Sequence, residues 1–395
     1  MTAASARRRP FRLRKSSAGA AVLALLAFPG PAASYGPQDP ETSPFAVKPV
    51  PRDPDGPPDW AYDAVLYSVD LASFPGSGKI VDLEEDLPRI RRLGANCVVL
   101  APVQPEDDPS AVRIERGTAD NLRDMILQAH SLGQKVVLDW DRPADVDVLA
   151  GWTRDFGLDG FRFIRGGPAD PLKTTRAVLI RTKPEILLAG DAGGESGPAP
   201  WLDLYGSASF GEALLEVRSG KAGAERLEEM VLSADPADRA ASLPIRSLPP
   251  GGSNIFGEEP SAHLALLLTG GGVPMIRSGE EAGEGRAVEK MMRRLAAARK
   301  KHPAFSRGQT FRVAASDGRS VLAFARFYRE DAIFTAVNLS KEPFEGTVLL
   351  PEIFRPGGGK IRLKRVLPGP DLSPGEEGRA SLRLPPWGAQ VWVLR

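Results

Sequence analysis

The segment 63–103 decides the fold, and it reads DAVLYSVDLASFPGSGKIVDLEEDLPRIRRLGANCVVLAPV. The apolar runs at 65–69 and 97–100 predict two buried strands, and the stretch 83–93 between them has the apolar spacing of an amphipathic helix. A strand, a helix and a second strand in this order are typical of a parallel sheet covered by helices. The segment therefore predicts an α/β fold.

The same alternation continues along the chain. We expect further strands at 136–139, 160–164, 186–189, near 207–210, near 241–245 and at 273–277, with helices clearest at 83–93, 121–132, 172–182, 224–232, 261–269 and 288–301. Eight strand–helix units predict a (β/α)₈ barrel over residues 60–303. Beyond Pro303 the runs become short and alternating, with turns at 357–359 and 374–375. Residues 304–395 are therefore predicted to form an antiparallel β-sandwich domain.

The N-terminal region differs in composition from the rest. Six basic residues between positions 7 and 15 precede an apolar run at 18–28, and small residues follow at 32–34. This layout predicts a secretory signal peptide or a short signal-anchor over 1–34. The stretch 35–59 holds eight prolines and is expected to be an extended linker. Both interpretations place the folded part outside the cytosol, either secreted or tethered at the cell surface.

Composition excludes several classes of function. The chain has 51 basic and 50 acidic residues, a formal net charge of +1, which leaves no electrostatic footprint for nucleic acid. The single cysteine, Cys97, lies in an apolar run and is expected to be a small buried hydrophobe. One cysteine permits neither a disulfide framework nor a cysteine-based zinc site.

Further stretches carry a family resemblance. They are GLDGFR at 157–162, GVPMIRSGEEAG at 272–283, RLAAARKKHPA at 294–304 and LPPWGA at 384–389. Together with the segment 63–103, and in this order, they resemble the α-amylase superfamily (glycoside hydrolase family 13-like). The resemblance implies a TIM barrel with a C-terminal β-domain, and a site at the C-terminal ends of the barrel strands.

The resemblance also implies which residues would carry retaining glycoside hydrolysis, which needs two carboxyl groups about 5–5.5 Å apart. The family nucleophile is an aspartate two residues beyond the arginine that is Arg162 here, and this chain has Ile164 at that position. The family proton donor, a glutamate, corresponds to Asp191. Asp139 is kept on strand three, but no His-Asp pair occurs at 243–250. We therefore expect these four positions to be vestigial, with no catalytic residue, cofactor or metal.

A different acid pair remains open. Asp139 and Asp191 would end strands three and five, about 9–10 Å apart, which approaches the inverting range of roughly 6.5–9.5 Å. Glu195 is a further carboxylate that could reach the site from a loop. However, Arg162 between the two aspartates would keep both ionised, which does not suit a proton donor.

One branch of the superfamily shares these losses, namely the non-catalytic heavy subunits of heteromeric amino-acid transporters. The stretches DLASFPGSG at 70–78 and ILLAG at 186–190, and the short step after strand three that leaves no room for an inserted domain, resemble one type of heavy subunit. The resemblance implies an escort that stabilises a polytopic light subunit. The linker has no cysteine for the intersubunit disulfide, which is a departure from that type.

Two other functions stay open at this point. The first is a divergent secreted glycoside hydrolase acting on α-glucosides. The second is a secreted barrel that binds carbohydrate weakly, with Trp60, Trp140, Trp152 and Trp201 as candidate sugar platforms. Asn338 in Asn338-Leu339-Ser340 is the only N-glycosylation sequon, and a eukaryotic cell would be needed to modify it.

Overall fold

The computed structural model describes residues 56–395 apart from 144, 166–167, 169, 192–200, 207, 234–241, 250–260, 282–286, 352–353, 355–362, 376 and 395. The predicted signal segment 1–34, most of the predicted linker 35–59, and Glu195 lie outside the described residues. Within the described part, no helix is both long enough and apolar enough to span a membrane.

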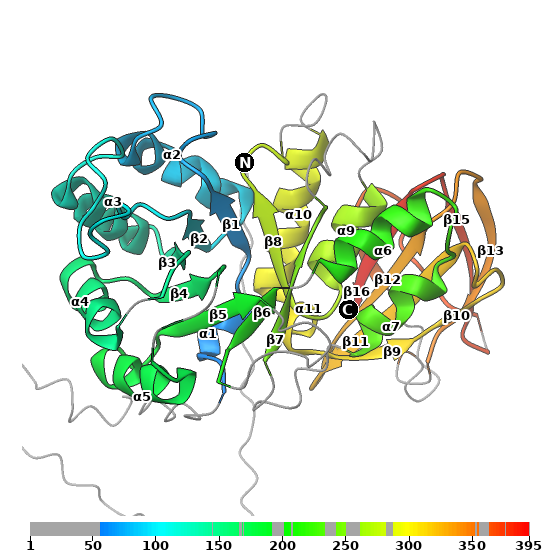
Figure 1. Ribbon diagram of the computed structural model, residues 1–395. Coiled ribbons are helices and arrows are strands. Elements are labelled where there is room, and N and C mark those ends of the chain that lie inside the picture. Colours follow the sequence, from blue (N-terminus) through cyan, green and yellow to red (C-terminus); the bar gives the residue numbers. More distant parts are fainter. Residues whose placement is uncertain are drawn as a thin grey trace, which may run out of the picture. The chain divides into compact units, whose positions relative to one another are not determined.

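Eight parallel strands close into a barrel in chain order, each hydrogen-bonded to the next and β8 to β1 (Figure 1). They are β1 Leu66–Val69, β2 Cys97–Leu100, β3 Lys135–Trp140, β4 Gly160–Phe163, β5 Leu187–Asp191, β6 Leu204–Gly206, β7 Leu243–Ser247 and β8 Val273–Arg277. This confirms the predicted TIM barrel. Strand β3 is followed by helix α4 after residues 141–145 alone, so this connection carries no inserted domain.

Helices cover the outside of the barrel. They are α2 Ile80–Leu93, α3 Ala119–Ser131, α4 Val146–Phe156, α5 Leu172–Thr182, α6 Ser209–Arg218, α7 Glu225–Ser233, α9 Ser261–Thr269 and α10 Ala287–Lys301, with the short α1 Asp59–Tyr62 and α11 Ala304–Arg307 before and after. In these elements, side chains on one face recur every two residues in a strand and every 3.6 residues in a helix, which is the spacing of apolar residues used to predict them.

The prediction of a strand near 207–210 is wrong. The sixth strand is Leu204–Gly206, and helix α6 starts at Ser209. Phe210, Leu214 and Val217 are buried on one side of that helix, at spacings of four and three residues. A three-residue strand is too short for a recognisable alternation, whereas the helical spacing after it was present in the sequence.

Side chains of the barrel strands alternate between the interior and the helix layer. Leu66, Val137 and Leu187 fill the interior, while Val98 and Val136 pack outward against helices. Cys97 is one of the interior residues and is fully buried, as predicted, and burial raises the pKa of its thiol well above the usual value. Because apolar side chains fill the lower layers, polar chemistry is confined to the two ends of the barrel.

The C-terminal part consists of two antiparallel sheets, one in the order β10-β13-β15 and one in the order β14-β16-β12-β11-β9. The strands are β9 Gln309–Arg312, β10 Ala314–Ala315, β11 Val321–Tyr328, β12 Asp331–Asn338, β13 Phe344–Leu349, β14 Leu363–Arg365, β15 Arg379–Leu384 and β16 Ala389–Leu394. Their shared core includes Phe334 stacked on Trp392 with ring centroids 5.2 Å apart. This confirms the predicted antiparallel β-domain.

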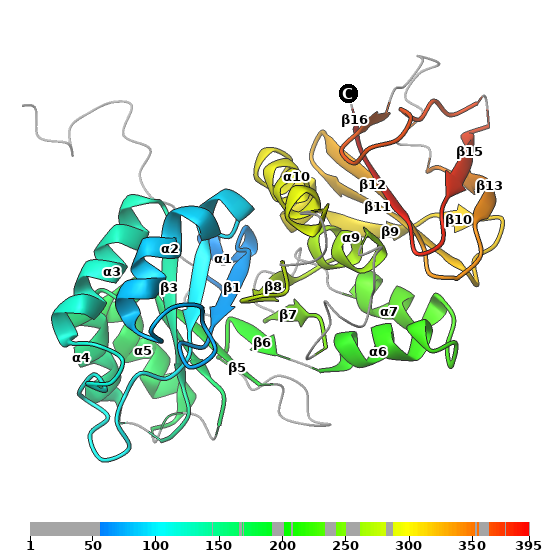
Figure 2. The ribbon, with the colours of Figure 1, turned by 90° about the horizontal axis from the view of Figure 1, so that it is seen from above.

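Helix α9 joins the two parts. It is buried from Ala262 to Thr269, because it packs on α10 and also contacts strands β12 and β16 of the larger sheet. Figure 2 shows these strands beside α9, on the side of the barrel that also carries α10. A helix that is apolar all round is expected where it is covered on every side.

Candidate functional site

The C-terminal ends of strands β3, β4 and β5 bring the four predicted positions together. Asp139 pairs with Arg162 across β3 and β4, and Arg162 pairs with Ala189 on β5. Ile164 directly follows β4, and Asp191 is the last residue of β5. The side chain of Asp191 lies outside what the structure describes. The four positions therefore lie at the same end of the barrel, at the ends of three neighbouring strands.

Gly160 lets β4 approach β5 closely where the two strands begin. A Cβ atom added at Gly160 would lie 2.6 Å from the carbonyl oxygen of Leu187, closer than atoms can pack. The pairing of β4 with β5 continues without a bulge, from Gly160 opposite Leu187 to Phe163 opposite Gly190. One further step places positions 164 and 191 side by side, with backbones about 4.8 Å apart. These are the two positions that a retaining enzyme would occupy with carboxyl groups.

Arg162 and Asp139 form a bidentate ion pair at the mouth of the barrel. Nε and one terminal nitrogen of Arg162 donate to the two carboxylate oxygens of Asp139 at 2.7 and 2.5 Å. The other terminal nitrogen lies 3.1 Å from Sδ of Met275 on β8. The side chains are 16% and 5% exposed respectively. Both oxygens of Asp139 therefore accept a hydrogen bond from the same guanidinium, in a charge-assisted bidentate pair.

Ile164 continues the pairing of β4 with β3, since its backbone N–H donates to the carbonyl oxygen of Trp140 at 2.9 Å. Its side chain is half-buried, as expected for a position at a partly solvated mouth. An isoleucine has no group that can attack an anomeric carbon or transfer a proton. The position where the family places its nucleophile is thus chemically inert here.

A second ion pair at the mouth was missed by sequence reasoning. Arg277, the last residue of β8, donates from a terminal nitrogen to Oε1 of Glu280 at 3.1 Å and from its backbone N–H to Oε2 at 2.9 Å. Burial raises the pKa of Glu280 above its ordinary value, although the backbone N–H and the guanidinium of Arg277 oppose that shift. The adjacent acids Glu280 and Glu281, which follow the eighth predicted strand, are the sequence feature that could have indicated this ion pair.

The side chain of Glu281 has different hydrogen-bond partners from that of Glu280. The hydroxyl of Tyr67 donates to Oε1 of Glu281 at 2.6 Å, and Arg89 on α2 donates to the same oxygen at 2.8 Å. Tyr67 belongs to the part of the core between the strands and the helices. Glu281 therefore fastens the loop after β8 to β1 and α2, which is a structural role.

The candidate sugar platforms are not available at the mouth. Trp140 and Trp152 are 1% and 2% exposed and pack edge to face with ring centroids 6.0 Å apart. Trp60 lies at the N-terminal end of the barrel, where its Nε1 donates to the carbonyl oxygen of Glu185 just before β5. Trp201 precedes β6, also toward the N-terminal ends of the strands. Trp140 and Trp152 are therefore packing residues, whereas Trp60 and Trp201 are half-buried and lie away from the mouth.

Asn338 is completely buried. Its Nδ2 donates to the carbonyl oxygens of Glu342 and Pro385 at 2.7 and 3.0 Å. Its Oδ1 accepts from the backbone N–H and the hydroxyl of Ser340. A glycan would leave Nδ2 with a single N–H, so at least one of the two carbonyl partners would be lost, and the geometry disfavours the modification expected from the sequon.

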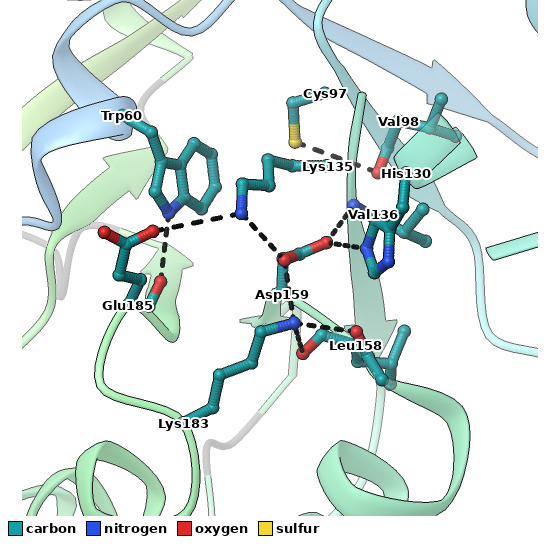
Figure 3. A network of polar contacts seen from close by, with 11 residues as sticks. Trp60, Cys97, Val98, His130, Lys135, Val136, Leu158, Asp159, Lys183 and Glu185 are labelled. Carbon is teal, nitrogen blue, oxygen red and sulfur yellow. Dashed lines mark hydrogen bonds and ion pairs between the residues drawn. The ribbon is translucent and has the colours of Figure 1, made fainter. Parts of the chain in front are cut away.

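A dense polar network occupies the opposite, N-terminal end of the barrel (Figure 3). Asp159, before β4, is 1% exposed and accepts from the backbone N–H of Val136 at 2.9 Å. Its oxygens also contact His130 Nε2 at 2.7 Å, Lys183 Nζ at 2.8 Å and Lys135 Nζ at 3.2 Å. Burial alone would raise the pKa of Asp159, but these partners together hold it well below its usual range. Residues at this end of such barrels serve stability rather than chemistry.

Comparison with known proteins bears on the fold. No protein-family model matches the chain, and no curated protein matches it. Among solved structures, a noncanonic maltogenic α-amylase from Thermotoga neapolitana aligns with 84% of this chain and 98% of its own, at 17% identity and a TM-score of 0.72. An α-amylase from Geobacillus thermoleovorans, complexed with acarbose, aligns at 14% identity, a TM-score of 0.68, and 85% and 99% of the two chains.

A debranching enzyme from Nostoc punctiforme, soaked with acarbose, is similar at 16% identity and a TM-score of 0.66, over 85% of this chain and 99% of its own. At such identities the likeness concerns the fold. The chain therefore has the barrel and the C-terminal β-domain of α-amylase-family enzymes.

Proposed function

We propose that this chain is a catalytically inactive α-amylase-type protein, which acts by binding a partner rather than by hydrolysing α-glucosides. The observation that carries the proposal is the residue at the nucleophile's place, where Ile164 directly follows β4 beside the end of β5 and offers no carboxyl group. A retaining mechanism needs two free carboxyl groups on neighbouring strands. Only one position of that pair, Asp191, bears an acid here.

The partner that the family resemblance implies is the polytopic light subunit of an amino-acid transporter. The direct step from β3 to α4 supports this choice, because the heavy-subunit type in question also lacks the inserted domain. An escort of this kind needs a stable barrel and no cleft. Co-isolation from native membranes tests it: the intact chain, cross-linked in its own host, should carry a polytopic membrane protein with it. Recovery as a soluble species without such a partner would overturn the escort role.

The buried carboxyl group of Glu280 at the barrel mouth favours one alternative function, that of a divergent glycoside hydrolase. It is a carboxyl group at the barrel mouth whose pKa is raised by burial, and a raised pKa is what a general acid requires. Against that role, both of its oxygens are bound by the backbone and guanidinium of Arg277. The alternative would also need a second carboxylate at a suitable distance, for which Asp191 is the candidate.

A hydrolysis assay separates the two functions. The purified chain is incubated with 4-nitrophenyl α-glucoside and with maltotriose, and product release is compared with that of the Glu280→Gln and Asp191→Asn variants. We expect no release above background from any of them. Release by the parent chain that either substitution abolishes would establish the hydrolase. Binding of maltotriose without turnover would instead favour a carbohydrate-binding barrel.

A further inference from the structure

A pocket of about 670 Å³ opens at the N-terminal end of the barrel, away from the mouth. Its walls come from the segment around Asp63 before β1, the end of α2, the outer face of α10 and the start of the C-terminal part at Arg307. Helices α2 and α10 meet closely beside it, since a Cβ on Gly94 would lie 2.2 Å from Cβ of Ala296. Its volume lies within the range of small-molecule pockets, roughly 300–1,000 Å³.

The lining of this pocket is strongly basic. It contains the cationic residues Arg91, Arg92, Arg293, Arg299, Lys300 and Arg307, against the single carboxylate of Asp63. Arg307 is already compensated, because it forms ion pairs with Asp59 at 2.8 Å and with Asp63 at 2.6 Å. The other cations therefore leave a net positive charge in the pocket, although the chain as a whole carries only +1.

Three of these cations are exposed, namely Arg92, Arg293 and Lys300. Arg293 lies 3.8 Å from the carboxylate of Glu289, and no described residue forms an ion pair with Arg92 or Lys300. Basic residues at the ends of α2 and α10 partly offset the negative ends of those helices. That explanation does not extend to Arg293, which lies two turns before the end of α10.

Arg299 adds a buried charge to the wall. It is 3% exposed, and its terminal nitrogens donate to the carbonyl oxygens of Leu268, Phe305, Tyr62 and Gly272. Its Nε has no hydrogen-bond partner in the described part of the chain, and no described carboxylate lies within ion-pair distance. The carboxylate of Asp63 acts on Arg299 from a distance and is shared with Arg307, so a further anion in the pocket would add favourable charge interactions.

We propose that this pocket binds an anion bearing a phosphate or pyrophosphate group. Several converging cations favour a multiply charged anion over a single carboxylate, and guanidinium groups match the geometry of phosphate oxygens. A neutral sugar is disfavoured, because the lining carries six cationic residues and only one aromatic side chain, Tyr328. The proposal does not depend on the mouth of the barrel or on the function proposed for it.

Calorimetric titration of the purified full chain with sodium pyrophosphate, in about 50 mM salt where screening is weak, tests the pocket. The test variant is Arg92→Gln/Arg293→Gln/Lys300→Gln. The control, Lys290→Gln/Arg294→Gln/Lys301→Gln, removes the same charge from exposed positions of α10 outside the lining. We expect the test variant to bind at least about tenfold more weakly and the control to stay within about twofold of the parent.

Phospholipid headgroups are a second source of the same chemistry. Sedimentation with phosphatidylcholine vesicles containing phosphatidylglycerol, against phosphatidylcholine alone, distinguishes them. Binding to the anionic vesicles but not to pyrophosphate would assign a lipid headgroup, and the reverse would assign a soluble phosphate. In both cases, the test variant must bind the probe more weakly than the parent, and the control variant must bind it as the parent does. Equal losses in the two variants, or no binding to either probe, would overturn the proposal.

Discussion

Replacing Asp159 by asparagine tests how the N-terminal end of the barrel is held together. The carboxylate is 1% exposed and joins the start of β3, through the N–H of Val136, to Lys135, Lys183 and His130 (Figure 3). Asparagine keeps the shape but removes the charge, and its Nδ2 would face groups that are themselves donors. We therefore expect a loss in the free energy of unfolding.

The expected loss in the free energy of unfolding follows from the burial of the Asp159 carboxylate and its partners. Removing one partner of a fully buried ion pair costs about 3–5 kcal/mol. Lys135 and Lys183 are 31% and 27% exposed, so solvent already screens part of the attraction. The lower end, about 3 kcal/mol, is the expected value. Glu185→Gln is the matched control: Glu185 lies 4.0 Å from Lys135 and is 63% exposed, so its loss should stay below about 0.5 kcal/mol.

The pH dependence gives a second check. The pKa of Asp159 is lower in the folded chain than its ordinary value of about 3.9, so its contribution is fully present above that value. The contribution is lost as the pH falls through the folded pKa. The difference between the parent and Asp159→Asn, measured by urea denaturation, should therefore be constant between about pH 7 and 5 and shrink below about pH 4. A cost under about 1 kcal/mol at pH 7, or a difference already shrinking above pH 5, would refute this account.

Three further outcomes are expected. Ile164→Asp should cost less than about 2 kcal/mol in urea denaturation, because the side chain is half-buried at the mouth; a cost of about 4 kcal/mol or more would place it in the core. Trp152→Ala should cost about 3–5 kcal/mol, because the ring is 2% exposed, and an unchanged stability would show that this side chain is not part of the packing. Secreted material should begin near Tyr35 by N-terminal sequencing, whereas intact Met1 in a membrane fraction would show an uncleaved anchor.

The placement of positions 139, 162 and 164 at neighbouring strand ends could be predicted, because it depends on local order along the strands. Asp139 and Arg162 lie near the C-terminal ends of two apolar strands, and parallel strands in register bring such ends to one face of the barrel. The spacing of two between Arg162 and Ile164 places both positions on the same side of β4. The bidentate geometry of the pair was not predictable, because it depends on how far one side chain reaches across the neighbouring strand.

Other parts of the site depend on residues far apart in the chain. Arg277 reaches the carbonyl oxygen of Leu248 on the neighbouring β7 side, and Tyr67 meets Glu281 across the closure of the barrel. The basic pocket likewise gathers Arg92, Arg293 and Arg307 from three separate segments. Sequence patterns report the period of each element but not which surfaces meet when the barrel closes.

The amino-acid sequence by itself determined the class of fold, the order of the elements and the absence of a nucleophile at position 164. Those properties follow from apolar periodicity and from the identity of single residues, both of which are local. Tertiary structure alone decided that Trp140 and Trp152 are core residues, that Asn338 is enclosed, and that basic residues from distant segments line one pocket. Burial and charge convergence are properties of the packed chain, because they arise only when distant elements exclude water from the same place.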